Sequence, residues 1–323
     1  MSHHGIMPSK RGKNYTMASA IGLRVYRITV NKRGDKTRLP LDCDDLSTSV
    51  PEFITDFISN HSNPTQDEEM ERSWYFENRN DDGLGSSQGY VHYGTFGFES
   101  NLIDTKTKKK NYRRKATDAE EIPLFYEFWC PEEESFGFAA FQSFQVRSCI
   151  RLVMKRMKDV FEARNPAFVL VFKKLLPGDA AGSAYFSADV RQLRLIKRKA
   201  PSDVAERYFN RHSPEPIDLE VVMSARRRGS LGPFSALLNK VKSGERNVIT
   251  HDGIEFPEAV AEIRVGKRTR KVGVLGFNGE AGVIDLTDVI VKGPDGHPTF
   301  ESLKKESDTI LRDFYDTLAG GVE

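Results

Sequence analysis

The ten residues from Lys106 to Lys115 contain seven lysines and arginines and one tyrosine. Cations at this density bind phosphate groups by ion pairing and by releasing the counterions that surround a nucleic acid. Tyr112 stands between Lys110 and Arg113 and could stack on an exposed base, as aromatic side chains do in proteins that bind single strands. The segment therefore predicts a nucleic-acid contact, and the alternative is a solvated loop.

Three further basic blocks occur along the chain, at Arg194 to Lys199, Arg226 to Arg228 and Arg264 to Lys271. Acidic residues are grouped as well, so a chain whose formal net charge is only +2 can still present a basic face. The residues predicted to contact nucleic acid are Lys108, Lys109, Lys110, Tyr112, Arg113, Arg114, Lys115, Arg226, Arg227, Arg228, Lys267, Arg268, Arg270 and Lys271.

Arg207 and His212 have the spacing R-x4-H. In a ribonuclease site a histidine and an arginine can activate a ribose 2′-hydroxyl and stabilise the pentavalent phosphate. The segment resembles the ribonuclease motif of HEPN proteins, which are helical bundles, although Tyr208 stands where a polar residue is usual. The alternative is a surface histidine beside the turn Ser213-Pro214.

Asp252 and the segment Glu262 to Arg264 are candidates for metal-dependent phosphoester hydrolysis. The segment resembles the E-x-K element of restriction-type nucleases, with arginine in place of lysine and with Asp218 or Asp252 as the first acid. The lysine normally helps to orient a water and to stabilise charge near a divalent cation, and an arginine does the latter only in part. The pair His251-Asp252 is better explained as part of a T-H-D-G hairpin turn.

No cofactor and no metal are predicted from the sequence. It contains neither a phosphate-binding glycine loop nor a G-x-S-x-G nucleophile motif. Cys43, Cys130 and Cys149 are widely spaced, without a C-x-x-C pair, which argues against a disulfide framework and a structural zinc site. No run of about 18 apolar residues and no secretory segment are present, so the expected compartment is the cytoplasm.

The elements that must position these residues are a mixture of strands and helices. Two alternating segments, Ile122 to Trp129 and Phe136 to Phe144, are expected to form a β-hairpin, with its aromatic residues in the core. Apolar residues at helical spacing from Val146 to Phe161 predict an amphipathic helix. The apolar run Ala167 to Phe172 completes a central β-β-α-β unit at about 122–172.

Other segments show the same periodicities. Strands are expected at 22–30, 73–78, 89–103, 190–196, 217–223, 258–265, 270–276 and 283–291, and helices at 51–58, 201–210, 234–241 and 300–318. Because strands and helices do not alternate strictly, the pattern favours an α+β fold with a mixed, mainly antiparallel sheet and packed amphipathic helices.

The chain is long enough for one large domain or two smaller ones. Residues 1–16 are polar and basic and are expected to be a disordered leader. Proline and charge interrupt the pattern near residues 200–216. The division expected is an N-terminal α+β domain at 17–200 and, at 201–323, either a second α+β domain or an extension of the same core.

Three functional hypotheses follow. The first is a nucleic-acid-binding protein that acts through its basic patches, and it is favoured because these patches are visible whereas a coherent catalytic set is not. The alternatives are a metal-dependent nuclease or other phosphoester hydrolase, and a protein-interaction subunit with an acidic partner. An accessory role in a larger assembly, such as phage defence or a mobile-element system, is compatible with the first hypothesis but follows from no residue.

Overall fold

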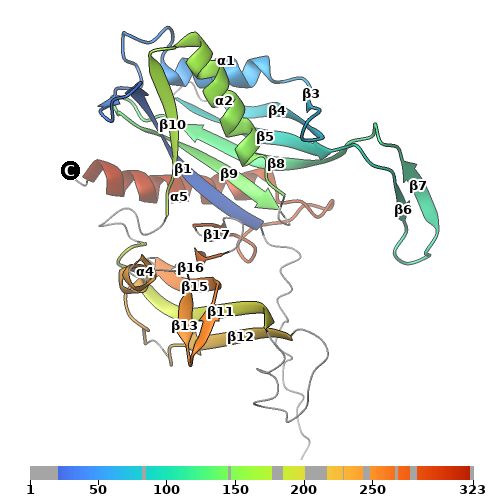
Figure 1. The fold of residues 1–323 in the computed structure, drawn as a ribbon, viewed down its shortest axis with the longest axis vertical. Coiled ribbons are helices and arrows are strands. Elements are labelled where there is room, and N and C mark those ends of the chain that lie inside the picture. The colour runs from blue at the N-terminus through green and yellow to red at the C-terminus, as the bar shows by residue number, and fades with distance from the viewer. Residues whose placement is uncertain are drawn as a thin grey trace, which may run out of the picture.

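The computed structural model describes residues 21–81, 85–144, 147–176, 185–200, 217–227, 229–242, 248–265, 268–276 and 282–320. Within these ranges the fold is mixed α+β and is built on one 13-stranded antiparallel sheet, which confirms the expected fold class (Figure 1). In spatial order the strands are β12 (Ile217–Ser224), β11 (Asp189–Ala200), β15 (Glu258–Val265), β16 (Arg268–Leu275), β17 (Ile284–Asp285), β1 (Ile21–Lys32), β9 (Gly137–Phe144), β8 (Glu120–Trp129), β5 (Ser86–Thr95), β4 (Arg72–Asp81) and β3 (Thr65–Asp67).

Two strands pair with β1 outside this path, β10 (Phe168–Lys174) and β2 (Arg38–Leu39). Two separate hairpins are formed by β6 (Ser100–Ile103) with β7 (Lys110–Arg114), and by β13 (Ile249–His251) with β14 (Ile254–Phe256). The helices described are α1 (Val50–Asn60), α2 (Ile150–Arg164), α4 (Phe234–Lys242) and α5 (Phe300–Gly320).

Strand β1 connects the two parts of the sheet. Along its first residues it pairs with β9 on one side and with β17 on the other, so that Leu23 lies opposite both Gln142 and Ile284. Leu23 and Val25 belong to one core, whereas Ile28 and Val30 belong to the core on the other face. Because successive side chains of a strand point to opposite faces, β1 is buried on both, as its apolar sequence predicts.

Helices α1 and α2 cover one face of the N-terminal strands (Figure 1). α1 begins at a capping box, in which the Ser49 hydroxyl accepts from the Glu52 backbone N–H and the Glu52 side chain accepts from the Ser49 N–H. Phe53 and Phe57 of α1 are buried, and the ring of Phe53 lies 5.2 Å from that of Phe161 on α2. The local sequence thus determines where α1 starts, and its aromatic face determines where it packs.

Helix α5 lies on the opposite face of the N-terminal strands and also contacts the C-terminal strands (Figure 1). Leu303, Ile310, Leu311 and Phe314 are at most 1 % exposed and belong to a core that includes residues of β1, β9, β11, β15 and β16. The predicted closing helix is therefore confirmed, and it joins both parts of the sheet.

The predicted β-β-α-β unit is confirmed as β8, β9, α2 and β10. Two expected strands differ from the structure. The segment 89–103 is divided into β5 and β6, with Gly97 at φ 97° between them. The segment 283–291 contains only the two residues of β17, because the chain turns where the backbone N–H groups of Val289 and Ile290 donate to the Leu286 carbonyl.

The expected domain boundary near residue 200 falls between β11 and β12, which pair with each other in the large sheet. The helix expected at 201–210 and the leader at 1–16 lie outside the described residues. In the part of the chain that is described, no helix is long and apolar enough to cross a bilayer. The three cysteines are free thiols, and burial raises the pKa of Cys130 and of Cys149 to about 12.

Gly89 on β5 is required by the close approach of β4. A Cβ atom at this position would lie 2.0 Å from the carbonyl oxygen of Glu77 and 3.1 Å from the backbone nitrogen of Arg79, next to a register shift between Asn78 and Asn80. Because these neighbours are backbone atoms, they cannot move without disturbing the ladder. We expect Gly89→Ala to lower the free energy of unfolding by about 3 kcal/mol, measured by urea unfolding.

Gly94→Ala on the same strand is the matched control, because its Cβ would meet only the side chain of Ala119 closely, at 3.1 Å. A smaller loss is expected there. Equal losses in the two variants would show that strand propensity, rather than the approach of β4, determines the effect.

Candidate functional site

The hairpin β6–β7 projects from the sheet between β5 and β8 (Figure 1). We call residues 96–119 the β-arm. Its base is the last pair between β5 and β8, Thr95 opposite Glu120. At its tip the Asp104 side chain accepts from the backbone N–H groups of Lys106 and Thr107, and Lys108 adopts a positive φ of 59°. These local bonds define a tight turn that presents the lysines at the end of the β-arm.

Most cations of the β-arm are turned to solvent. Lys106, Lys108, Lys109 and Lys110 are exposed, and none of these four has an ion-pair partner among the residues that the structure describes. Arg113 is exposed too, but its guanidinium pairs with Glu99 at 2.7 Å. The positive charge of the tip is therefore not balanced by any acid among the residues that the structure describes.

The β-arm also exposes apolar surface. Phe98, Leu102, Ile103 and Tyr112 are each about half exposed, and Leu102 is paired with Tyr112 across the two strands. The Tyr112 hydroxyl donates to Asp118 at 2.5 Å, which raises the pKa of Tyr112. Cations and apolar side chains thus share one projecting element, which is a combination typical of an interaction surface.

Arg114 anchors the β-arm instead of facing solvent. Its side chain is 4 % exposed, stacks 4.2 Å from the Phe98 ring and lies 3.5 Å from Glu120. Its guanidinium also donates to the carbonyl oxygens of Thr95 and Asp118. These contacts use most of its donors, so Arg114 orients the β-arm on the sheet.

The basic block after β12 lies far from the β-arm. Arg226 and Arg227 are exposed, and they follow β12, which ends the sheet order, whereas the β-arm leaves the sheet between β5 and β8. Arg228, Lys267 and the side chain of Arg268 lie outside the described residues. The structure therefore places the exposed arginines of this block away from the β-arm.

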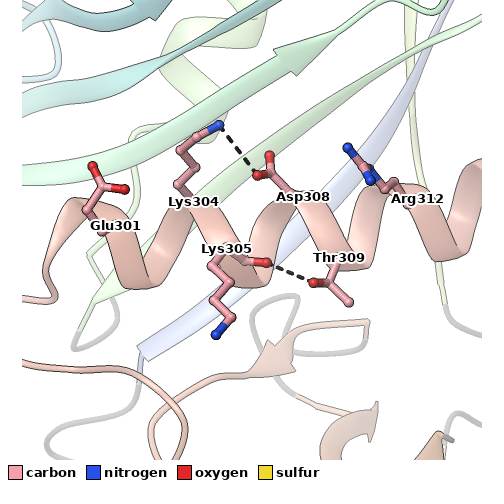
Figure 2. Close-up of a pocket in the computed structure, with 6 residues that line it drawn as sticks. All are labelled: Glu301, Lys304, Lys305, Asp308, Thr309 and Arg312. Atoms are coloured by element: carbon pink, nitrogen blue, oxygen red, sulfur yellow. Dashed lines mark hydrogen bonds and ion pairs between the residues drawn. The ribbon is translucent and has the colours of Figure 1, made fainter.

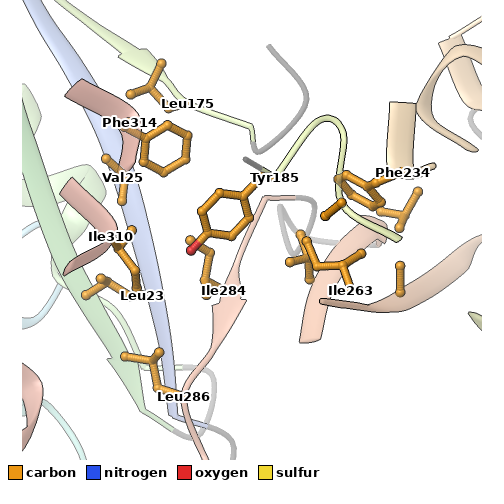
Figure 3. Packing of buried hydrophobic residues seen from close by; sticks show 14 of the residues in the cluster. Leu23, Val25, Leu175, Tyr185, Phe234, Ile263, Ile284, Leu286, Ile310 and Phe314 are labelled. Atoms are coloured by element: carbon orange, nitrogen blue, oxygen red, sulfur yellow. The ribbon is translucent and has the colours of Figure 1, made fainter. Parts of the chain in front are cut away.

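Lys115 of the β-arm is exposed, whereas two other candidate cations make internal ion pairs. Lys271 Nζ lies 2.6 Å from Asp288 Oδ2. Arg270 is 3 % exposed, and its Nη1 lies 2.5 Å from Oε2 of Glu306 on α5. Tyr185 is buried in the same core, where its ring stacks 5.7 Å from that of Phe314 beside Ile284 (Figure 3). Arg270 thus links β16 to α5 inside the protein.

The catalytic candidates do not form a common site in the described structure. Arg207 and His212 lie outside the described residues. Asp252 occupies the turn between β13 and β14, where its side chain is 87 % exposed, so the interpretation of T-H-D-G as a hairpin connection is confirmed. Glu262 is on β15, opposite Lys271 of β16.

One buried polar cluster was missed by sequence reasoning. Gln88 of β5 donates from Nε2 to Glu127 Oε1 at 2.8 Å and to Asp308 Oδ1 at 2.9 Å, and its Oε1 accepts from Lys304 Nζ at 2.7 Å. Lys304 and Asp308 also form an ion pair at 3.4 Å along α5 (Figure 2). Gln88 and Glu127 are 1 % and 3 % exposed. We call these four residues the Gln88 cluster.

Burial dominates the electrostatics of Glu127. It raises the pKa of this carboxyl group to about 8, and the negative charge of Asp308 acts in the same direction, whereas the Ser307 hydroxyl and the Gln88 amide lower it. Glu127 is therefore neutral at pH 7. The available signal in the sequence was that Glu127 is the only charged residue in a strand of otherwise apolar side chains, Ile122 to Trp129.

No group of three His, Cys, Asp or Glu side chains within the described ranges is arranged to hold a metal ion. The fold and the site together define an α+β protein with a projecting basic β-arm and a polar cluster beneath its last helix. No protein-family model matches the chain, and no curated protein matches it in sequence. Its function is therefore inferred from its own residues.

Proposed function

We propose that the protein is a cytoplasmic nucleic-acid-binding protein whose β-arm contacts the phosphate backbone. The main support is the group of four exposed lysines, Lys106, Lys108, Lys109 and Lys110, which have no ion-pair partner in the described structure. Since these cations pair with no acid in the described part of the chain, phosphates can bind them without first breaking such a pair. Because the net charge of the whole chain is only +2, attraction to phosphates is expected from the β-arm and not from the protein as a whole.

The apolar side chains of the β-arm support the same proposal. Tyr112 and Leu102 are about half exposed and lie next to the lysines. An exposed ring beside cations can stack on an unpaired base, as in proteins that bind single strands. A two-stranded ribbon also fits the width of the DNA major groove. Both single and double strands are therefore suitable probes.

Reversing two charges of the β-arm, with Lys109→Glu and Lys110→Glu, is expected to weaken nucleic-acid binding at least tenfold at about 100 mM salt. Each lysine that contacts a phosphate contributes about one unit to the slope of log affinity against log salt, so this slope should fall by about two. Fluorescence anisotropy with labelled single- and double-stranded DNA and RNA across a salt series measures both quantities.

The matched control is Arg151→Glu with Lys155→Glu, which makes the same change of charge on the exposed side of α2. Affinity within about twofold of the wild type is expected, because these cations lie on another element. Equal weakening in both variants would mean that only net charge matters. Unchanged affinity in the β-arm variant would exclude the β-arm, and Arg226→Glu with Arg227→Glu then tests the other exposed block.

The same titration separates the alternative functions. Parallel samples with magnesium or a chelator, run on a denaturing gel, detect cleavage and would favour a nuclease. If no nucleic acid binds at low salt, the cations of the β-arm are better assigned to an acidic protein partner.

A further inference from the structure

Two hollows lie along α5 next to the Gln88 cluster. The first, of about 230 Å³, is lined by Gln88 and Glu127 from the sheet and by Lys304, Asp308 and Arg312 from α5. The second, of about 280 Å³, extends along the exposed side of the helix and shares Lys304, Asp308 and Arg312 with the first (Figure 2). In Figure 2 the side chains of Lys304, Asp308 and Arg312 point to the same side of α5.

Internal contacts alone leave this cluster incomplete. The second carboxylate oxygen of Glu127, Oε2, is buried and has no hydrogen-bond partner among the described residues. A buried polar atom without a partner is rare in folded proteins and costs about 1–3 kcal/mol. Glu127 is 3 % exposed and also lines the first hollow. Glu127 is therefore a buried group whose hydrogen bonding is incomplete in the fold and which borders the first hollow.

The charges around the two hollows determine which kind of molecule fits. With Glu127 neutral, the first hollow has two cations, Lys304 and Arg312, against one anion, Asp308. The second adds Lys305 and Glu301, so cations again exceed anions by one. Lys304 already forms an ion pair with Asp308. Arg312 is exposed and has no ion-pair partner within the described ranges. A protonated carboxyl group, an ammonium and a guanidinium are all hydrogen-bond donors.

We propose that the hollow beneath α5 binds a small molecule that carries a phosphate or carboxylate group, with Arg312 and Lys304 as its cationic contacts and Glu127 as a hydrogen-bond donor. Arginine and lysine are the usual partners of such oxyanions, and a carboxylic acid that stays neutral near pH 7 can donate to them. This site is separate from the β-arm and does not depend on nucleic-acid binding.

The proposed binding depends on pH through Glu127. The charged groups that face it come from α5, namely Asp308, Lys304 and Arg312, whereas β5 contributes Gln88 and β9 contributes Ala140, which do not titrate. Burial raises the pKa of Glu127 to about 8. Above this pH it becomes an anion that repels the ligand, so affinity should fall about tenfold for each further pH unit.

The test is isothermal titration of the full chain with inorganic sulfate, whose charge is constant from pH 6 to pH 9, and then with inorganic phosphate, succinate and adenosine monophosphate. Wild-type binding at pH 7 should weaken about tenfold at pH 9. Arg312→Gln should weaken binding at least fivefold at pH 7. Glu127→Gln, which is neutral at every pH, should bind at pH 7 and lose the pH dependence.

Two controls complete the experiment. Arg38→Gln removes an exposed arginine on β2 and should leave affinity unchanged. The variant Lys109→Glu with Lys110→Glu should also bind the small anion normally, which separates this site from the β-arm. Binding of sulfate or phosphate alone identifies a site for a free anion, and binding of adenosine monophosphate only identifies the phosphate of a nucleotide. No binding of any probe at millimolar concentration, or an Arg312→Gln variant that binds normally, would overturn the proposal.

Discussion

Glu127→Gln is expected to flatten the pH dependence of folding stability and to make the protein more stable than the wild type at pH 8. The pKa of Glu127 is raised from 4.5 to about 8 in the folded protein, mainly by burial. Between these values the folded state holds a proton that the unfolded state has lost, so stability decreases as the pH rises. The free energy of unfolding should fall by about 1.4 kcal/mol per pH unit in this window.

Glutamine keeps the acceptor for the Gln88 amide but has no proton to lose, so this decrease should be absent from the variant. Urea unfolding at pH 5, 6, 7 and 8 measures the difference. Glu132→Gln, at an exposed glutamate in the turn between β8 and β9, is the matched control and should follow the wild type. A wild-type profile as flat as that of Glu127→Gln would contradict the assignment of a neutral, buried Glu127.

Removing Glu306 is expected to destabilise the protein strongly. Arg270 is 3 % exposed, and the Glu306 side chain, which is 10 % exposed, lies 2.5 Å from it. In Glu306→Ala the guanidinium would stay buried without its counter-charge. Breaking a buried pair in this way costs about 3–5 kcal/mol, so a large fall of the urea midpoint is expected at pH 7.

The double variant Arg270→Met with Glu306→Leu tests the cause of this loss. It removes both charges and keeps apolar volume, so it should recover most of the stability, because the desolvation of two ions disappears together with their attraction. The control is Asp45→Ala, which breaks the exposed pair of Asp45 with Lys32 at 3.4 Å and should cost less than about 1 kcal/mol. A loss from Glu306→Ala as small as from Asp45→Ala would show that the internal pair does not hold α5 to β16.

Both predictions concern charged groups that lie against α5, and this helix makes polar contacts on two sides. Asp308 and Lys304 reach Gln88 on β5, and Glu306 reaches Arg270 on β16. The helix therefore connects the N-terminal and C-terminal strands through paired side chains as well as through its apolar face. Any ligand held beside Arg312 would add a further contact between this helix and the sheet.

The sequence by itself determined the fold class and most of the long strands and helices. The alternation of apolar residues at 122–144 predicted β8 and β9, and the helical spacing that follows predicted α2. The helical pattern at 51–58 predicted α1. These features depend on neighbours two to four residues apart, because side-chain direction repeats every two residues in a strand and about every 3.6 in a helix. The basic segment Lys106 to Lys115 could also be recognised from the sequence, because its cations are close neighbours along the chain.

Only the tertiary structure decided which of these residues meet. Gln88, Glu127 and Asp308 come from three distant segments, and no local pattern relates them. The burial of Arg114 and Arg270 was likewise not visible, since a cation in a basic run has the same local sequence whether it faces solvent or an acid from another element. Pairing across long separations depends on the packing of the whole sheet and of α5, and this packing places lysines on a projecting arm and a neutral carboxyl group beneath a helix.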